Sequence, residues 1–410
     1  MKILYIGFFG DLSSPSNGVT KKIVTKIKYL NSNDTTCKLI SFSEQIKEVK
    51  IYNEHITILP VNQGSSLRWF ASIDQIKLSC LGALEYLNQH IHSFDVVIFR
   101  YPLASKYFLN ILKVHANKIF IEHNTIELDE ITVNSRIYRK NIPFSWKPGY
   151  FVHYAVVGIF PIWREKIYKE KILRYAKGGI CVTNEIGEFL KRIYPKYNYV
   201  VASNGYEFEG VEPLKYKEIK NEVKLIMLVG CSSPWHGIER ICNSIKQYKG
   251  NKKVVIDVFG INSDDTYAKK YALKGESGEL NFLGYLKVSE VKTKLTDYHG
   301  GMSTMQLYLK GLNEAASLKT REYLSYGLPV VYGYSDSDIE SNKIIKKNCI
   351  QFPNNSSLID FNRIIMTLED LYKNKNIYND ISSTAKQTIN YEVKAKELIN
   401  NLKNWANKVY

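Results

Sequence analysis

The chain has 410 residues, of which 45% are hydrophobic and 23% charged; these are the proportions of a soluble globular protein, and they exclude a disordered one. Its length predicts two domains rather than one. Six cysteines without paired spacing argue against a disulfide framework or a zinc site and favour a reducing cytoplasm, and no apolar run reaches the roughly 18 residues that a membrane span needs.

The formal net charge is +16, which indicates an anionic partner such as a nucleotide, a nucleic acid or a lipid surface. A second explanation stands beside it. The chain is rich in Lys, Asn, Ile and Tyr, which an A+T-rich genome produces through codon bias alone. The charge by itself does not decide between the two.

The N-terminal residues predict the opening of a Rossmann-like unit. Residues 2–7 form an apolar run typical of a buried strand and carry no signal-peptide cleavage site. A glycine-containing loop, 10–18, follows and ends at Gly18, and 19–30 is an amphipathic helix. Strand, glycine loop and helix begin a Rossmann-like unit. The loop lacks G-x-G-x-x-G, so no dinucleotide is indicated.

Strand and helix signals then alternate up to residue 184. The expected strands and helix are 36–41, 67–90 (the helix), 95–100, 118–122 and 179–184. This alternation predicts a parallel sheet with helices on both faces, and ligands bind such sheets beyond the carboxyl ends of the strands. His123 lies at such an end and is a candidate functional residue; the alternative is a structural histidine bonded to a loop carbonyl.

Residues 136–177 break the pattern because they hold ten basic residues against two acidic ones, half of the net charge, with ten aromatic residues interleaved. The apolar stretch 149–163 inside them is too short to span a membrane. Apolar residues flanked by tryptophan and basic side chains suit the interface of an anionic membrane. The alternative is a helix packed in a domain cleft with a solvated basic face. Nucleic acid is not expected, since no binding module surrounds the segment.

The second half repeats the pattern of the first. After a polar segment, 206–222, that reads as a linker, the strand at 224–230 mirrors 2–7, and the loop 231–237 again leads into a helix. The predicted fold class is therefore α/β, with two Rossmann-like domains facing a central cleft. We assign 1–205 to the first domain and 223–390 to the second, and the helix at 391–410 can cross back to the first.

The stretch 311–334 reads as a loop, a short helix, a turn and a buried strand. Ser317 is expected to cap a helix that begins at Leu318, and Gly327 suits the left-handed residue that closes it. A helix start with free amides, beside Lys319 and Arg321, is a natural phosphate site.

Two carboxylates bracket this phosphate site. Glu314 and Glu322 lie eight positions apart and can accept hydrogen bonds from hydroxyl groups. Phosphate donors flanked by hydroxyl acceptors predict a pocket for a nucleotide sugar.

The same residues carry a family resemblance. Glu314, seven intervening residues, Glu322 and then Gly-Leu-Pro-Val-Val resemble retaining glycosyltransferases of the GT-B fold, in the large group called family four. Asn17-Gly18, His123, 203–205 and the strand end 229–230 support the resemblance more loosely. The segment 235–237 and the stretch 313–324 resemble the transferases that build bacterial surface polysaccharides.

The resemblance implies a role for each matched residue. Glu322 would bind the donor ribose, Glu314 the sugar hydroxyls, and the amides of residues 317–319 the diphosphate. His123 would contact the transferred sugar, and Gly18 would approach the phosphate or the acceptor from the first domain. The expected site comprises Glu314 and His123 as catalytic residues, and Glu322, Ser317, Leu318, Lys319, Thr320, Arg321, His236, Gly237, Trp235, Gly18 and Asn204 as donor-binding residues.

One departure from the family concerns the cation opposite the leaving diphosphate. Family members usually carry an Arg and a Lys in the loop after the first strand of the second domain. Here that loop, 231–237, has His236 about where the Lys belongs and no Arg. A neutral His stabilises an anion less than a permanent charge does. Lys319, Arg321 or Arg240 is expected to compensate, and the sequence leaves the choice open.

A second motif raises the question of a metal site. Asp336-Ser337-Asp338 matches the D-x-D of metal-dependent transferases, but it follows a strand of the second domain, so we expect a turn. No metal or cofactor is implied.

The sequence therefore predicts a metal-independent retaining glycosyltransferase that moves a sugar from a nucleotide diphosphate sugar to a glycan or lipid-linked acceptor. We expect it in the cytoplasm, with residues 136–177 on the inner face of the cell membrane as an additional hypothesis. The alternatives are a catalytically inactive partner protein of the same fold and a sugar-nucleotide epimerase.

Overall fold

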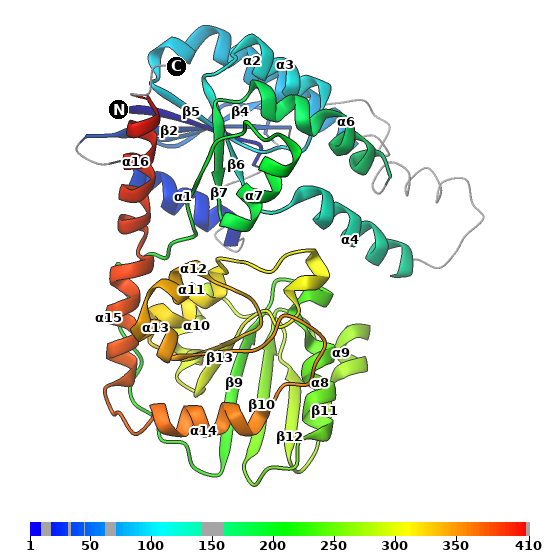
Figure 1. The fold of residues 1–410 in the computed structure, drawn as a ribbon, viewed down its shortest axis with the longest axis vertical. Helices are drawn as coiled ribbons and strands as arrows, with labels where there is room; N and C mark the ends of the chain where they lie inside the picture. The colour runs from blue at the N-terminus through cyan, green and yellow to red at the C-terminus, as the bar shows by residue number, and fades with distance from the viewer. Residues whose placement is uncertain (10–17, 32–33, 45, 62–70, 142–158, 407–410) are drawn as a thin grey trace. The chain divides into compact units, whose positions relative to one another are not determined.

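A computed structural model describes residues 1–9, 18–31, 34–44, 46–61, 71–141 and 159–406 (Figure 1). The chain divides into two compact units. The N-terminal unit comprises residues 1–202 and 395–410, and the C-terminal unit comprises 203–394. The C-terminal unit therefore begins at Ser203, just before the predicted linker 206–222. This linker, which the structure describes throughout, contains no helix, and its last residue, Glu222, is the first residue of strand β9.

The N-terminal unit is built on a sheet whose described strands run in the order β3-β4-β2-β1-β5-β6-β7-β8. Every neighbouring pair is parallel except β3 and β4. The strands are β1 Lys2–Gly7, β2 Thr36–Ser43, β3 Lys50–Asn53, β4 Ile56–Pro60, β5 Val96–Arg100, β6 Ile119–His123, β7 Gly178–Cys181 and β8 Tyr199–Val201. The helices are α1 Gly18–Leu30, α2 Ala71–His90, α3 Lys106–Val114, α4 Glu127–Asn141, α6 Phe160–Tyr175, α7 Asn184–Ile193 and, from the end of the chain, α16 Tyr391–Ala406.

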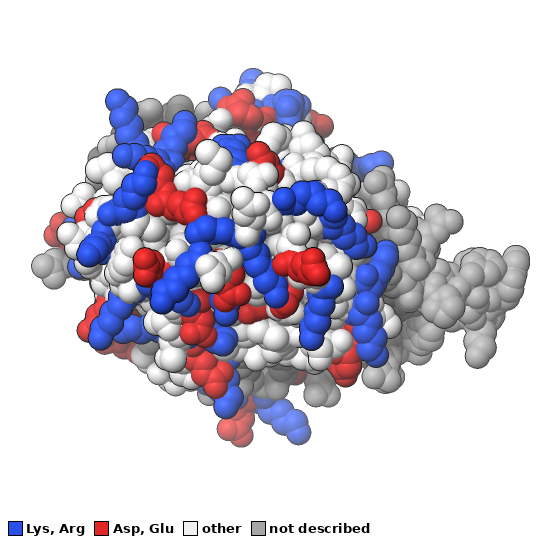
Figure 2. All heavy atoms as spheres, turned by 90° about the horizontal axis from the view of Figure 1, so that it is seen from below, with Lys and Arg blue, Asp and Glu red and all other residues white. Residues whose placement is uncertain are grey.

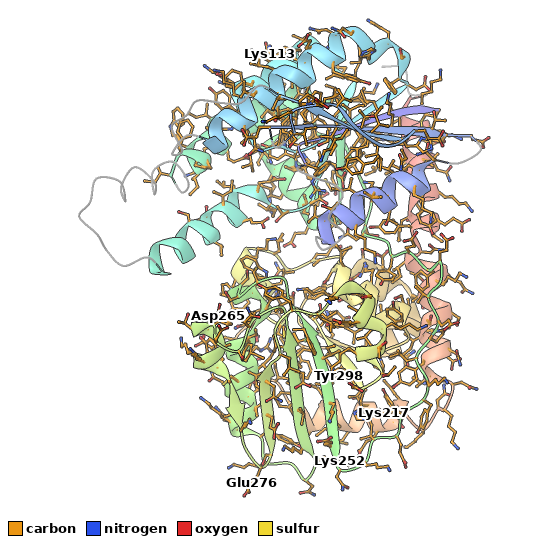
Figure 3. All side chains as sticks on the ribbon, turned by 180° about the vertical axis from the view of Figure 1, so that it is seen from behind. Lys113, Lys217, Lys252, Asp265, Glu276 and Tyr298 are labelled. Carbon is orange, nitrogen blue, oxygen red and sulfur yellow. The ribbon has the colours of Figure 1, made fainter. Side chains whose placement is uncertain are left out.

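The two faces of this sheet are covered by different helices. Helices α2 and α3 lie along one face, and α1 lies on the other (Figures 1 and 3). Because both faces are covered, β1 is a continuous apolar run, with residues 3–6 fully buried.

The C-terminal helix α16 belongs to the core of the N-terminal unit. Its residues Leu398 and Leu402 join the buried cluster that includes Ile3 and residues of α1. Near the end of the helix, the Trp405 ring stacks on Phe120 with 5.0 Å between ring centroids. The last helix therefore returns to the first unit, as its sequence allowed.

The C-terminal unit has a second sheet, whose described strands run in the order β11-β12-β10-β9-β13-β14-β15. Its neighbouring pairs are parallel except β11 and β12. The strands are β9 Glu222–Leu228, β10 Lys253–Phe259, β11 Leu273–Lys274, β12 Gly278–Phe282, β13 Gly300–Met302, β14 Val330–Tyr332 and β15 Cys349–Gln351. The α-helices are α8 Ile238–Gln247, α9 Thr266–Tyr271, α10 Val288–Leu295, α11 Leu318–Ser325, α12 Ser337–Ser341, α13 Lys343–Lys347, α14 Phe361–Leu371 and α15 Ile377–Ile389, with 3-10 turns at Pro234–His236 (η3) and Leu307–Lys310 (η4).

The repeated strands β1 and β9 hold equivalent places in the two sheets. Each pairs on one side with the next parallel strand, β2 or β10, and on the other with a later one, β5 or β13. The strand order reverses at this point, and ligands of open parallel sheets bind beyond the carboxyl ends of the strands there. In the C-terminal unit these ends lead into residues 229–237 and 303–317.

Figures 2 and 3 locate the opposite end of that sheet. Lys252 and Glu276, which precede β10 and β12, lie at the end of the unit away from Asp265, which follows β10 (Figure 3). Seen from that end, basic and acidic side chains alternate over the described surface (Figure 2). The net positive charge of the chain is therefore mixed with negative charge on this face.

Candidate functional site

The helix α11 and its flanks have the predicted local structure. The helix begins at Leu318 with Ser317 as its N-cap residue, but the Ser317 hydroxyl makes no capping hydrogen bond, so that part of the prediction is wrong. Gly327 has φ +84°, and a Cβ there would lie 2.1 Å from the carbonyl oxygen of Tyr378. Only glycine fits this turn, which sends the chain into β14.

Glu322 lies one turn into α11 on its less buried side. Its Oε1 accepts a hydrogen bond from the hydroxyl of Tyr206 at 3.2 Å. Burial, followed by the charge of Glu322, raises the pKa of Tyr206, so this hydroxyl keeps its proton and remains a donor. The sequence analysis did not predict a role for Tyr206. Its position directly after the Ser-Asn-Gly of residues 203–205 was the signal that could have identified it.

Glu314 is held at the other side of the loop by its backbone. A short parallel bridge pairs it with Ser335. The flanking hydrogen bonds run from Ala315 N to Ser335 O at 3.0 Å and from Ser335 N to Asn313 O at 2.8 Å. Both predicted carboxylates are half-buried, so each retains surface that a ligand can contact.

Asn204 fixes the chain that enters α11. Its Nδ2 donates to the carbonyl oxygen of Ala316 at 2.6 Å, and its own carbonyl accepts from Arg321 Nε at 3.1 Å. Its Oδ1 is buried and bonds to no described residue. The contact from Asn204 therefore positions the residue immediately before the Ser317 cap.

Thr320 and Arg321 point into the interior and not toward open surface. The Thr320 hydroxyl bonds to Ser303 Oγ at 3.0 Å and to the hydroxyl of Tyr334 at 2.6 Å. The Arg321 side chain is fully buried and donates to both carboxylate oxygens of Asp336 and, at 2.5 Å, to Asp338.

This network also accounts for the D-x-D motif. Asp336 caps the short helix α12 by accepting from the amide of Asp338 at 3.2 Å, so the segment is a capped helix start where a turn was expected. Lys394 donates to the remaining oxygen of Asp338 at 2.7 Å. Both carboxylates thus form salt bridges with cationic side chains. Within the described ranges no group of three or more His, Cys, Asp or Glu residues that could hold a metal ion is present.

The loop after β9 carries Trp235, His236 and Gly237. It forms η3, and Gly237, at φ +79°, starts α8. The carbonyls of residues 235 and 236 accept from the amides of Gln306 at 3.1 Å and Met305 at 3.2 Å. These bonds tie the loop after β9 to the loop after β13.

His236 is only 6% exposed, and its Nδ1 is buried without a partner among the residues that the structure describes. Burial, and then the charges of Lys319 and Lys310, hold its pKa well below the usual value. The imidazole is therefore neutral at physiological pH.

Gly18 and His123 belong to the N-terminal unit. Gly18 is the exposed first residue of α1. His123 ends β6 and is fully buried, with Nδ1 3.2 Å from Glu127 Oε1 and Nε2 3.4 Å from the hydroxyl of Tyr197. Burial outweighs the nearby Glu127 and lowers the pKa of His123, so the ring is neutral and enclosed in this structure.

A cavity of about 290 Å³ lies at the carboxyl ends of β5 and β6. Its lining includes Arg100, Glu122 and Glu127. Glu122 accepts from the hydroxyl of Tyr5 and pairs with Lys26 at 3.2 Å. The sequence analysis missed this cluster, although a charged residue at the end of an apolar strand, as at positions 100 and 122, is a detectable signal.

Helix α6 is the longest described part of the basic and aromatic segment 136–177. Residues 136–141 end α4, and residues 142–158 lie outside the described ranges. Its first turn exposes apolar surface at Ile159, Phe160 and Trp163. A cavity of about 300 Å³ beside it is lined by residues of α2, α3 and α6. Some of the charge is internal: Lys169 donates to Glu127 at 2.5 Å. Within the described parts of the chain, no helix is long and apolar enough to cross a membrane.

Comparison with solved structures places this architecture. The chain is similar to the sucrose-phosphate synthase of Thermosynechococcus elongatus, with a TM-score of 0.61, 12% identity and 98% of each chain covered. It is similar to the lipopolysaccharide outer core galactosyltransferase WaaB, with a TM-score of 0.59, 15% identity and coverage of 98% of this chain and 99% of WaaB. It is also similar to Anabaena HepE in complex with UDP-glucose, with a TM-score of 0.58, 12% identity and coverage of 98% and 100%.

No family model and no curated protein sequence matches the chain. Identities of 12–15% establish the fold. The chain has the GT-B fold of these glycosyltransferases, with one parallel-rich sheet in each of its two units. The predicted α/β fold class is confirmed.

The structure thus gathers most of the predicted donor residues in one unit. Residues 235–237, Asn204, Glu314 and the first turns of α11 follow the carboxyl ends of neighbouring strands of the C-terminal sheet or contact the residues that do. Gly18 and His123 lie on the N-terminal unit.

Proposed function

We propose that this protein is a glycosyltransferase that takes a sugar from a nucleotide diphosphate sugar with retention of configuration and without a metal. The observation that carries the proposal is the start of α11, where helix amides are flanked by two half-buried carboxylates, Glu314 and Glu322, beyond the carboxyl end of β13. Helix starts bind phosphate, and carboxylates accept hydrogen bonds from sugar hydroxyls. HepE, which shares the fold, was solved with UDP-glucose bound.

The residues divide the work by chemistry. Glu322, oriented by Tyr206, binds the ribose hydroxyls, and Glu314 binds hydroxyls of the transferred sugar. The amides of residues 317–319 bind the diphosphate, and the contact from Asn204 to Ala316 keeps that turn in place. The protein then contributes mainly positioning and charge stabilisation, and the leaving diphosphate helps to remove the proton of the attacking hydroxyl.

The N-terminal unit is proposed to hold the acceptor, a glycan or a lipid-linked sugar of surface polysaccharide synthesis. Its cavity at β5 and β6 offers Arg100, Glu122 and Glu127 to polar groups. The side chain of His123 is enclosed in this structure, so a contact with the transferred sugar requires Tyr197 or its other neighbours to move.

A peripheral contact with the cytoplasmic face of an anionic membrane is proposed for the first turn of α6. Trp163 is 52% exposed beside Phe160, and Trp side chains favour the membrane interface. Trp163→Glu is expected to weaken binding to vesicles containing anionic phosphatidylglycerol at low salt. Met366→Glu is the matched control, because Met366 is 68% exposed on α14 of the other unit. Equal binding by all three proteins would refute the membrane contact.

The test of the transferase proposal is a thermal-shift panel of nucleoside diphosphates and nucleotide sugars, followed by donor hydrolysis with EDTA present. A ligand at 100 times its dissociation constant adds about 2.7 kcal/mol of stability. We expect slow release of nucleoside diphosphate by the wild type and none by Glu314→Ala.

The same assays separate the two alternatives. Tight nucleotide binding without turnover supports an inactive partner protein, which the missing Arg and Lys of the loop 231–237 favour. A changed sugar without release of nucleoside diphosphate supports an epimerase.

A further inference from the structure

The diphosphate that leaves in such a transfer needs a positive charge beside it, and the loop after β9 does not supply one. It contains His236, which is neutral, and no Lys or Arg. The three cations that the sequence analysis named, Arg240, Arg321 and Lys319, lie on the elements around the site. A fourth, Lys310 at the end of η4, lies over the Trp235 ring and provides the control variant. The contacts of the first three in the structure differ sharply.

Arg240 is committed to backbone carbonyls. Its Nε donates to Ser357 O at 2.5 Å, and its Nη1 donates to Met305 O at 2.6 Å and to Pro353 O at 3.0 Å. The side chain is buried. Arg240 therefore holds loops together and does not present its charge to a ligand.

Arg321 is committed to carboxylates. Its guanidinium bonds to Asp336 and Asp338, and its charge is balanced inside the unit. Removing an Arg from such a buried network leaves uncompensated charges, which is strongly unfavourable. Arg321 is thus held in the interior.

Lys319 differs from both. It is the second residue of α11 and is half-buried. Within the described residues no hydrogen bond or salt bridge of its ammonium group is found. Its electrostatic neighbours are Cys231, on the loop after β9, and Glu322, one turn along the helix. The ammonium thus lies among the groups that line the expected phosphate site.

His236 gives an independent sign of a ligand at the same place. Its Nδ1 is buried without a partner among the described residues, and after burial the charges of Lys319 and Lys310 lower the pKa of the ring. A buried ring nitrogen without a hydrogen bond is costly. A phosphate oxygen beside Lys319 would accept a hydrogen bond from this nitrogen in the tautomer that carries the proton on Nδ1.

We infer that Lys319 is the cation that binds the donor's diphosphate, with neutral His236 completing the site. The inference rests on the proposed function. In this arrangement one Lys at the start of α11 takes the place of the Arg and Lys that the resembling family carries in the loop after β9. The helix amides at the start of α11 attract the same phosphate groups.

The affinity should depend on pH in a defined direction. Burial lowers the pKa of Lys319 to about 8, and Cys231 and Glu322 raise it less than burial lowers it. Diphosphate binds the protonated ammonium, so affinity is full below about pH 8 and falls above it, by at most about tenfold per pH unit for one linked proton. Cys231→Ser removes one group that raises the pKa of Lys319, so the fall in affinity should persist and begin at no higher pH. A fall that disappears in Cys231→Ser would assign it to the thiol instead of Lys319.

The experiment is calorimetric titration of the full chain with UDP and, as a phosphate-free probe, uridine. Lys319→Ala should weaken UDP binding by about tenfold to hundredfold, as expected for a charge-assisted hydrogen bond, and leave uridine binding and the melting temperature unchanged. Lys319→Arg should bind UDP without the fall above pH 8. Lys310→Ala is the control, because its ammonium lies 5.4 Å from the Trp235 ring centroid and its loss removes the same charge nearby.

The outcomes are distinguishable. The inference is overturned if Lys319→Ala binds UDP as tightly as the wild type does. It is also overturned if Lys319→Ala loses as much affinity for uridine as for UDP, or if Lys310→Ala loses more affinity for UDP than Lys319→Ala does. Each of these outcomes leaves the proposed function intact. If the wild type binds none of UDP, ADP, GDP and CDP, the proposed function is overturned, and the inference with it.

Discussion

Replacing Glu122 by Gln should destabilise the N-terminal unit in a pH-dependent way. Glu122 is 2% exposed at the end of β6, where it accepts from Tyr5 and pairs with Lys26 at 3.2 Å. The charges of Lys22 and Arg100 also lower the pKa of Glu122. Gln has nearly the same shape but no charge, so Glu122→Gln leaves this group of cations without its carboxylate.

The magnitude follows from the pKa of Glu122. Burial raises it, but Lys26, Lys22 and Arg100 together outweigh burial and bring it from 4.5 to about 2. Each pKa unit corresponds to about 1.4 kcal/mol, so the ionised carboxylate contributes about 3 kcal/mol to the free energy of unfolding at pH 7. Because the folded pKa is the lower one, this contribution is complete above about pH 4.5. It shrinks to about 2 kcal/mol at pH 3.5 and vanishes below about pH 2.

Urea unfolding at pH 7, 5 and 3.5 checks this, with hydrogen exchange of β1 and β6 peptides reporting on the N-terminal unit alone. Glu85→Gln is the matched control, since Glu85 is exposed on α2. A deficit below about 0.5 kcal/mol at pH 7, within the usual range for a surface change, would refute the reasoning. So would a deficit that is the same at all three pH values.

Three further outcomes are expected. Leu402→Ala, at a fully buried position on α16, should destabilise the N-terminal unit by about 2–5 kcal/mol in urea unfolding, although it lies near the end of the chain. Gly327→Ala should cost more than Gly210→Ala in the same measurement: both have positive φ, which costs roughly 1–2 kcal/mol, but only at Gly327 does the new Cβ meet a carbonyl. Tyr206→Phe, which removes the donor to Glu322, should weaken uridine binding by roughly twofold to tenfold in calorimetry.

The fold could be predicted where the sequence pattern is local and strong. The run at 2–7 is β1, and the run at 224–230 overlaps β9, which begins and ends two residues earlier, at Glu222 and Leu228. Both were detectable because a central parallel strand is largely apolar on both faces. The sheet order was out of reach, since it depends on pairings between distant strands. Short strands such as β8 and β15, of three residues each, were missed, because three residues carry no usable periodicity. The equally short β14 was predicted from the helix and the closing glycine that precede it.

The site divides in the same way. The residues flanking α11 could be found because the helix, its closing glycine and both carboxylates lie within 14 residues of sequence. The charged cluster of the N-terminal unit could not, because its contacts join residues far apart: Tyr5 meets Glu122 across 117 positions. Long-range contacts of this kind are created by the tertiary fold and leave no local pattern.

The roles of Lys319 and Arg321 were left open by the sequence analysis, but helix geometry could have distinguished them. Two residues apart on an α-helix, they point about 200° from each other. Arg321 shares its face with Leu324 and Ser325, three and four positions on, which are fully buried. Lys319 lies between the two faces: Glu322, three positions on, is half-buried, whereas Tyr323, four positions on, is fully buried. The periodicity of this single helix therefore assigns Arg321 to the interior, and that interior holds Asp336 and Asp338 as its counter-charges. The same periodicity leaves Lys319 beside the carboxylate proposed to bind the ribose, which is where a cation for the diphosphate must stand.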